Sequence, residues 1–121
     1  MNRKILLGMA LLITMPFANA DSVQLACKLK NPNQVQMIEC ASEKYDHYDH
    51  QLNLLYQTKI KKLQKSKANQ LKSSQRVWVN KKETDCNHYS EEDNGSNGPL
   101  EAFECFTQMT KERIVFIKKY K

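Results

Sequence analysis

The sequence predicts an all-α fold, a three-helix up-down-up bundle with a long helical hairpin, stapled by two disulfides. Only three glycines and three prolines occur among 121 residues, too few for the many turns of an all-β sandwich or barrel. Hydrophobic side chains instead recur at three- and four-residue steps over three long stretches. Hydrophobic residues make up 40% and charged residues 26%, which excludes a disordered tail and a multi-span membrane protein.

The first twenty residues are expected to be a cleaved signal peptide. Arg3 and Lys4 precede an apolar stretch that ends at Phe17, and Ala18-Asn19-Ala20 has the small-x-small pattern of a cleavage site. The stretch is shorter than the roughly 20 residues of a transmembrane helix. Cys27 lies too far beyond it for a lipobox. We therefore expect an exported protein, periplasmic or secreted and not lipid-anchored, with one domain over residues 21–121 and a net charge lowered from +6 to +4.

The first helix is expected from near Gln34, capped by Asn33, to about Gln64, after an irregular lead-in over residues 21–33. The polar run Lys65–Asn69 is the candidate turn, and a second helix follows from about Asn69 to Tyr89. Residues 91–99 hold two of the three glycines and form a clear break. A third amphipathic helix then runs from Leu100 to the end of the chain.

Four cysteines lie in the expected mature chain: Cys27, Cys40, Cys86 and Cys105. An even number in a small exported protein indicates two disulfides, for which three pairings are possible. We favour the two local bridges, Cys27–Cys40 and Cys86–Cys105. The alternative is that the four cysteines bind zinc, but no C-x2-C pair occurs and export disfavours free thiolates.

Charges are segregated along the sequence. Nine lysines and arginines and no acid lie between His50 and Lys82, and four more cations follow Glu112. All thirteen acids lie in residues 21–49 and 83–112, with only four cations. In an up-down-up bundle the turn between the first two helices and the chain end share one end, so the molecule is expected to be strongly dipolar. One interpretation of the basic end is solubility together with favourable cations at helix C-termini. The other is that Lys61, Lys62, Lys65 and Lys67 contact an anionic lipid or cell-wall polymer.

Several segments carry a pattern similar to a known family. They are Asp49-x-x-Leu52-Asn53-x-x-Tyr56, Leu71-x-x-x-Gln75-x-x-Trp78, Lys82-Glu83-Thr84-Asp85-Cys86, and Gly95-Ser96 with Cys105-x-x-x-x-Thr110-x-x-Arg113. In this order they resemble the LprI-type lysozyme-inhibitor family over roughly residues 36–116. Lys82-Glu83 stands where that family usually has Arg-Asp. The resemblance implies a small exported helical protein, with members linked to inhibition of lysozyme.

We assign most motif residues a structural role, because buried polar networks more often specify packing than catalysis. These structural motif residues are Asp49, Leu52, Asn53, Tyr56, Gln75, Trp78, Thr110 and Arg113. His47 and His50 lie three residues apart, but a solvated pair is a better interpretation than a metal site. The sequence contains no triad, P-loop or zinc-finger spacing. We therefore expect a non-enzymatic binding protein without metal or cofactor.

The leading hypothesis is an inhibitor of lysozyme or a related cell-wall hydrolase. Because C-type lysozymes are basic, the contact is expected at acidic residues. The candidates are Glu91, Glu92 and Asp93, with Glu43 and Asp46 nearby. The alternatives are an envelope adaptor that holds anionic lipid or polymer through its basic end, and an immunity protein against a delivered toxin. A nucleic-acid partner is not expected, because the basic tract lacks interleaved aromatic residues.

Overall fold

A computed structural model describes residues 27–91 and 95–121, apart from the side chains of Glu91 and Ser96. The described elements are α2 (Gln34–Lys62), α3 (Lys65–Glu91), a short 3₁₀ helix η1 (Gly95–Asn97) and α4 (Gly98–Lys119). The expected signal peptide, residues 1–20, lies outside the described residues. Within the described part of the chain, no helix combines the length and apolar character needed to cross a membrane.

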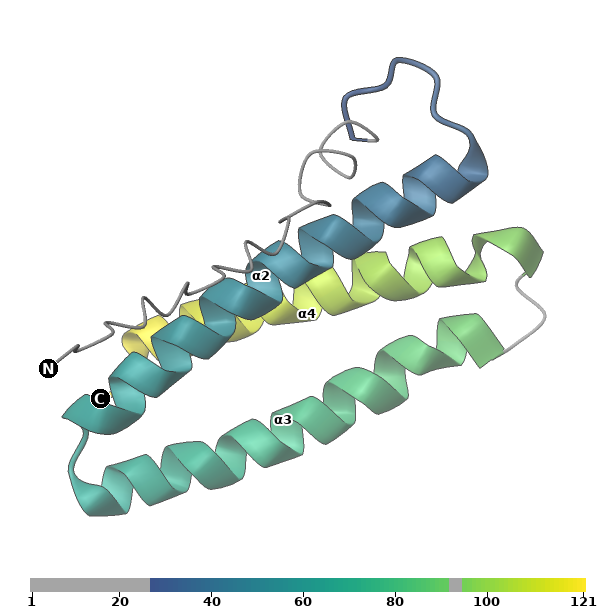
Figure 1. Cartoon of the computed structure of the whole chain (residues 1–121). Helices are drawn as coiled ribbons and strands as arrows, with labels where there is room; N and C mark the ends of the chain where they lie inside the picture. The colour runs from purple at the N-terminus through teal and green to yellow at the C-terminus, as the bar shows by residue number, and fades with distance from the viewer. Residues whose placement is uncertain (1–26, 92–94) are drawn as a thin grey trace, which may run out of the picture.

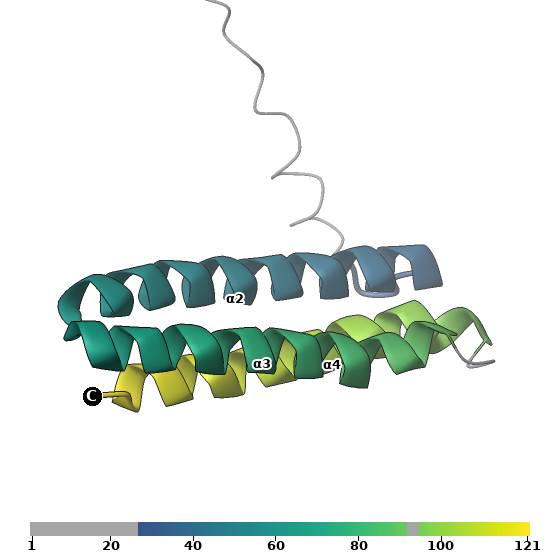
Figure 2. The same cartoon turned by 90° about the horizontal axis from the view of Figure 1, so that it is seen from below.

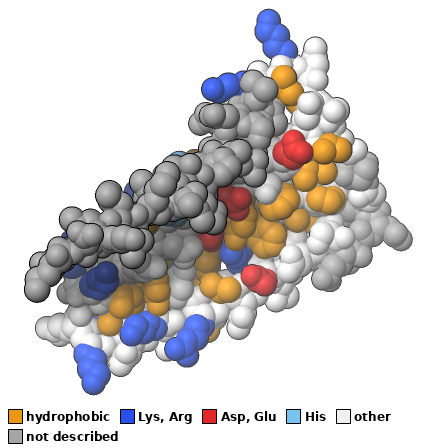
Figure 3. Space-filling view, in the orientation of Figure 1, with side chains coloured by type: hydrophobic (Ala, Val, Ile, Leu, Met, Phe, Trp, Pro, Cys, Tyr) orange, Lys and Arg blue, Asp and Glu red, His pale blue; other side chains and the backbone are white. Residues whose placement is uncertain are grey.

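The three long helices lie side by side in an up-down-up order (Figures 1 and 2). This confirms the predicted all-α bundle, but its hairpin is open. Helices α2 and α3 are joined at one end and contact each other at few positions, whereas α4 packs along both of them. On the face seen in Figure 3, hydrophobic side chains fill the space between α2 and α3. The last helix is therefore the central packing element of the fold.

Helix α2 begins where the sequence predicts. The side chain of Asn33 accepts a hydrogen bond from the backbone N–H of Gln36, and the Gln36 side chain accepts one from the backbone N–H of Asn33, both at 2.9 Å. This reciprocal capping satisfies two N–H groups that have no partner inside the helix. Helix α4 begins at Gly98, two residues before the predicted Leu100, because Pro99 is tolerated in a first helical turn.

The predicted turn at Lys65–Asn69 is wrong, since those residues form the first part of α3. The chain reverses over Leu63 and Gln64 alone, with Leu63 in an extended conformation at φ −78° and ψ 150°. Leu63 packs against the core and its backbone N–H donates to the Lys59 carbonyl at 3.1 Å. An apolar residue thus makes the connection, which a search for polar turn formers could not find. Helix α3 also continues two residues beyond the predicted Tyr89, to Glu91.

The aliphatic core lies in the half of the bundle nearer the α2–α3 connection. Leu52, Leu71, Ile114 and Ile117 are buried and come from all three helices. Half-buried side chains pack around them: Tyr48, Leu55, Tyr56, Ile60, Leu63, Trp78 and Tyr120. Burial of each large aliphatic side chain contributes about 1.5–3 kcal/mol to stability.

The last residues of α4 are attached to the α2–α3 connection. The Lys59 ammonium donates to the carbonyl oxygens of Lys118 at 3.2 Å and Tyr120 at 2.9 Å, and the Tyr120 hydroxyl lies 3.4 Å from the Lys67 carbonyl oxygen. We call this region, residues 59–70 and 116–121, the basic end. It brings together the two basic tracts of the sequence, as the charge pattern predicts (Figure 1).

Candidate functional site

Both disulfides lie at the opposite end of the bundle. Cys27–Cys40 attaches the segment before α2 to that helix, with Cα atoms 5.0 Å apart, and Cys86–Cys105 joins α3 to α4, with Cα atoms 5.5 Å apart. The two predicted local pairings are therefore confirmed. We call this region, residues 27–48, 82–91 and 98–109, the disulfide end. Gln34 also links it to η1, by donating to the Asn97 side chain at 3.1 Å.

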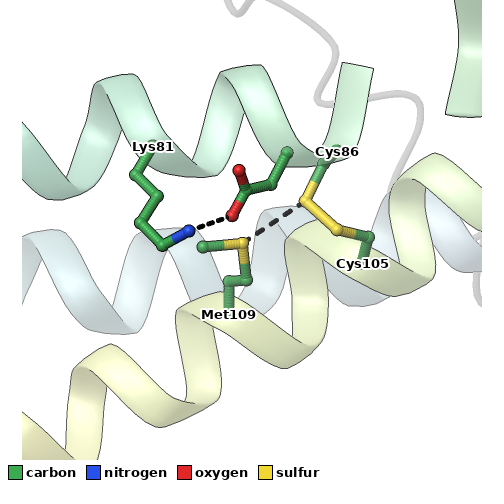
Figure 4. A network of polar contacts seen from close by, with 5 residues as sticks. Lys81, Cys86, Cys105 and Met109 are labelled. Atoms are coloured by element: carbon green, nitrogen blue, oxygen red, sulfur yellow. Dashed lines mark hydrogen bonds and ion pairs between the residues drawn. A yellow bond between two sulfur atoms is a disulfide. The ribbon is translucent and has the colours of Figure 1, made fainter. Parts of the chain in front are cut away.

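The Cys86–Cys105 bridge is packed against Met109 (Figure 4). The Met109 Sδ lies 3.5 Å from the Cys86 Sγ. A half-cystine carries no thiol hydrogen, so this is a sulfur–sulfur packing contact and not a hydrogen bond. Lys81 and Asp85 form an ion pair at 2.5 Å on the outer side of α3. Because both side chains are exposed, that pair contributes at most about 1 kcal/mol.

Beside this bridge, Lys82 is buried among aromatic rings. Its ammonium donates to the Tyr45 hydroxyl at 2.7 Å and lies 5.1 to 5.6 Å from the ring centroids of Tyr45, Trp78 and Phe106. The Tyr45 and Phe106 rings are themselves 5.2 Å apart. Cation–π attraction strengthens when the cation is removed from water, so the three rings compensate part of the cost of burying this charge.

Arg113 is a second buried cation beside Trp78, with its guanidinium carbon 5.6 Å from the centroid of that ring. Its guanidinium donates to Gln75 at 2.9 Å and Ser74 at 2.8 Å, and lies 4.3 Å from the Phe116 ring. Burial lowers the pKa of the Arg113 guanidinium below its ordinary value, an effect partly offset by Tyr56. Among the described residues, no carboxylate lies within ion-pairing distance of Lys82 or Arg113. Both charges are thus held by aromatic faces and neutral polar groups.

A groove of about 830 Å³ lies between the first half of α2 and α4. One wall comes from the lead-in segment and α2, and includes Leu29, Met37, Glu43, His47 and Tyr48. The other wall belongs to α4 and includes Leu100, Glu104, Gln108 and Lys111. The Cys27–Cys40 bridge also lines this groove, so the disulfide fixes the position of its rim. Leu29 and Met37 are partly exposed apolar side chains there, 40% and 36% accessible.

The predicted acidic contact residues are only partly brought together. Glu43 lines the groove, with its Oε2 3.8 Å from the Cys27 Sγ. Glu104 lines the opposite wall of the groove, on α4. Asp46 is exposed but does not line the groove. Glu92, Asp93 and the side chain of Glu91 lie outside the described part of the structure. Helix α3 ends at Glu91 and η1 begins at Gly95, so the segment between them connects elements of the disulfide end.

Most of the motif residues lie on the facing sides of the helices, whereas Asn53 is exposed. Asn53 donates to Asp49 at 3.0 Å along α2, and Leu52 and Thr110 are fully buried. The Thr110 hydroxyl has no hydrogen-bond partner among the described atoms. Gln75 and Trp78 both contact Arg113. These contacts connect the motifs of separate helices through Trp78, Gln75 and Arg113.

The two candidate metal-binding histidines are not brought into a metal site. His47 contacts Gln51, with 3.0 Å between their Nε2 atoms, and its ring lies 5.4 Å from the Tyr48 ring. His50 is exposed. Over the described residues, no group of three or more histidine, cysteine, aspartate or glutamate side chains is arranged to hold a metal ion.

Glu104 and Lys111 are groove residues that sequence reasoning did not single out. Each lies on the amphipathic pattern of the third helix, but the sequence does not show which part of α2 faces it. The Cys27–Cys40 pairing does not supply this information, because it fixes only the lead-in segment against α2.

Comparison with known proteins adds one finding to this geometry. No curated protein and no solved structure gives a significant match to the chain. The profile of the family described as lysozyme inhibitor LprI, by contrast, matches residues 27–116. The match begins at the first cysteine of the lead-in segment and covers most of α4, and it therefore includes both disulfides, the groove and the motif residues around Trp78. The chain belongs to the lysozyme inhibitor LprI family.

Proposed function

We propose that this protein is an exported inhibitor of a lysozyme-type cell-wall hydrolase and that the groove at its disulfide end makes the contact. Family membership supports a lysozyme-inhibitor-like binding role. The observation that carries the choice of surface is the groove between α2 and α4. It combines carboxylates from Glu43 and Glu104 with the accessible apolar side chains of Leu29 and Met37.

The chemistry of this surface suits a basic protein partner. Carboxylates at the groove would attract lysine and arginine side chains of a hydrolase and guide its approach. The apolar rim would supply the area that is removed from water on binding. Glu91, Glu92 and Asp93 belong to the segment that joins elements of the same end, and we include them in the proposed contact.

The disulfides support this surface by preorganisation. Cys27–Cys40 holds the segment that carries Leu29, and Cys86–Cys105 fixes α4 against α3. A binding surface that is already rigid loses less conformational entropy when the complex forms. The net charge of +4 expected for residues 21–121 opposes encounter with a basic partner. The groove lining is balanced, with Glu43 and Glu104 against Lys44 and Lys111. Over the disulfide end as a whole the acids outnumber the lysines, so the local field there favours encounter instead.

The test is titration of the oxidised protein into a lysozyme turbidity assay, with several lysozyme types at low and physiological salt. We expect near-stoichiometric inhibition of one type. Charge reversal at Glu43 and Glu104 (E43K/E104K) should weaken inhibition by at least about tenfold, because like charges then face each other. A second variant, E91K/E92K/D93K, tests the contribution of the connecting segment in the same way.

The matched control is E83K/E112K, which makes the same change in net charge at two exposed positions outside the groove. It should inhibit almost as well as the wild type. Equal losses in the groove variant and this control would reject the groove as the contact surface. No inhibition of any lysozyme at large excess of oxidised protein would reject the function itself.

A further inference from the structure

The basic end gathers exposed lysines from two distant parts of the sequence. They are Lys61, Lys62, Lys65, Lys67, Lys118, Lys119 and Lys121. The contacts of Lys59 with the end of α4, and of Tyr120 with Lys67, hold these two parts together. No Asp or Glu occurs between His50 and Lys82 or after Glu112, and no Asp or Glu side chain of the described residues forms an ion pair with these lysines. Figure 3 shows several of these blue side chains around the α2–α3 connection, at the lower left of the view.

An exposed aromatic ring lies beside this cluster. Phe116 is 43% accessible, and its ring centroid lies 5.8 Å from that of Tyr120. The Tyr120 hydroxyl in turn reaches toward Lys67 and Gln70 of α3, at 3.4 and 3.5 Å. Lysines that face headgroup phosphates and aromatic rings at the depth of the interface are the combination that surface-bound proteins use on membranes.

From this juxtaposition we propose that the basic end binds the surface of an anionic phospholipid bilayer. The lysine ammonium groups contact the headgroup phosphates, and Phe116 inserts at the interface beside Tyr120. A soluble polyanion would engage the lysines without using an exposed phenyl ring. The position of Phe116 next to the lysines is therefore what favours a bilayer over a polymer.

This orientation leaves the groove free. Helix α2 has 29 residues, which corresponds to a length of about 40 Å, and the groove lies along its other half. A molecule bound through its basic end therefore holds the disulfide end away from the bilayer. The proposal does not depend on the inhibitor function, because it rests on residues that the groove does not include.

The experiment measures cosedimentation of the processed, oxidised protein with vesicles. Vesicles of phosphatidylglycerol and phosphatidylcholine are compared with phosphatidylcholine alone, at low and high salt. We expect binding only to the anionic vesicles and loss of binding at high salt. The variant K61Q/K62Q/K65Q/K67Q should bind at least about tenfold more weakly, because each lysine near an anionic surface contributes severalfold to affinity.

The chain offers a control of equal charge. K28Q/K30Q/K44Q/K111Q removes the four cations of residues 21–49 and 83–112, so both variants lower the net charge of residues 21–121 from +4 to 0. The control should weaken vesicle binding much less than K61Q/K62Q/K65Q/K67Q does, because Lys28, Lys30 and Lys44 lie more than a Debye length from the basic end and only Lys111 lies near it. Equal losses in both variants, or no binding by the wild type, would overturn the proposal.

Phe116→Ser separates a bilayer from a polymer. It should weaken vesicle binding severalfold and leave binding to inorganic polyphosphate unchanged. If Phe116→Ser has no effect on vesicles and polyphosphate binds as tightly as vesicles do, the partner is a polyanion and the bilayer proposal is wrong. Circular dichroism checks that each variant is folded. The variant K61Q/K62Q/K65Q/K67Q should keep the lysozyme inhibition of the wild type, so the two proposals succeed or fail separately.

Discussion

The two ends of the bundle are stabilised by different kinds of interaction. In the half of the bundle nearer the basic end, Leu52, Leu71, Ile114 and Ile117 form an aliphatic core to which all three helices contribute. At the disulfide end, the interior holds aromatic rings, the buried Lys82 ammonium and the Cys86–Cys105 bridge. The end with enough aliphatic burial has no cross-link, whereas the end with an aromatic interior and a groove in its surface has two. Disulfides thus allow that end to present a binding surface without a large apolar core of its own.

The largest effect is expected from breaking the aliphatic core. Leu71→Ala removes a fully buried side chain and should lower the free energy of unfolding by about 2–5 kcal/mol. Urea denaturation measured by circular dichroism provides the value. Val77→Ala is the control on the same helix, because Val77 is 69% exposed and should change stability by less than about 0.5 kcal/mol. A similar small effect for both would mean that stability does not depend on this core.

Removing the disulfides tests the other end. The variant C86A/C105A should lose about 3 kcal/mol, because the bridge closes a loop of 19 residues between two packed helices. The variant C27A/C40A removes the bridge that closes a loop of 13 residues and holds only the lead-in segment to α2. It should lose less stability than C86A/C105A does. For each kcal/mol of stability lost, however, it should weaken lysozyme inhibition more strongly than C86A/C105A does. Inhibition unaffected by C27A/C40A would show that the groove rim is not needed.

The buried lysine gives a smaller and more specific test. Lys82→Met keeps a long side chain among the three rings and removes a buried charge that has no carboxylate partner among the described residues. We expect the melting temperature to stay unchanged or rise, corresponding to at most about 1–2 kcal/mol of stabilisation. Lys82→Ala should instead destabilise, through lost packing. A large loss of stability in Lys82→Met would mean that the charge itself is required.

Thr110 provides the smallest expected effect and lies between the two ends. Its hydroxyl is fully buried and has no hydrogen-bond partner among the described atoms. Thr110→Val keeps the shape of the side chain and removes the unsatisfied hydroxyl, so it should raise the free energy of unfolding by about 1 kcal/mol. Thermal unfolding of the two proteins makes the comparison. A loss of stability would indicate that a buried water binds this hydroxyl.

Local sequence signals predicted much of this fold. Asn33 at the start of α2 and the two short-range cysteine pairs needed only neighbouring residues to be recognised, and the structure confirms them. The α2–α3 connection was misplaced because the chain turns at Leu63, which the core holds in an extended conformation. The amino-acid composition of residues 65–69 does not reveal the contacts between Leu63 and the core.

The site was less predictable than the fold. Glu43 was singled out for its charge alone, and its position opposite Glu104 depends on how α2 and α4 are aligned. The sequence shows that Lys82 stands where the family usually has arginine, but its burial depends on rings from α2 and α4 that the sequence does not place around it. Both the position of Glu43 and the burial of Lys82 depend on how the helices pack against one another, which the periodicity of the sequence does not determine.

The central position of α4 has a consequence for the order of folding. Helices α2 and α3 make few contacts with each other, so neither has a stable packing partner until the residues of α4 have been synthesised. Isolated helices are marginal in water, and we therefore expect the nascent chain to stay unfolded until its last segment is available. A chain that folds only late is well suited to crossing a membrane in an extended state. A fragment ending at Asn97 should accordingly show weak helical circular dichroism, which addition of α4 would restore.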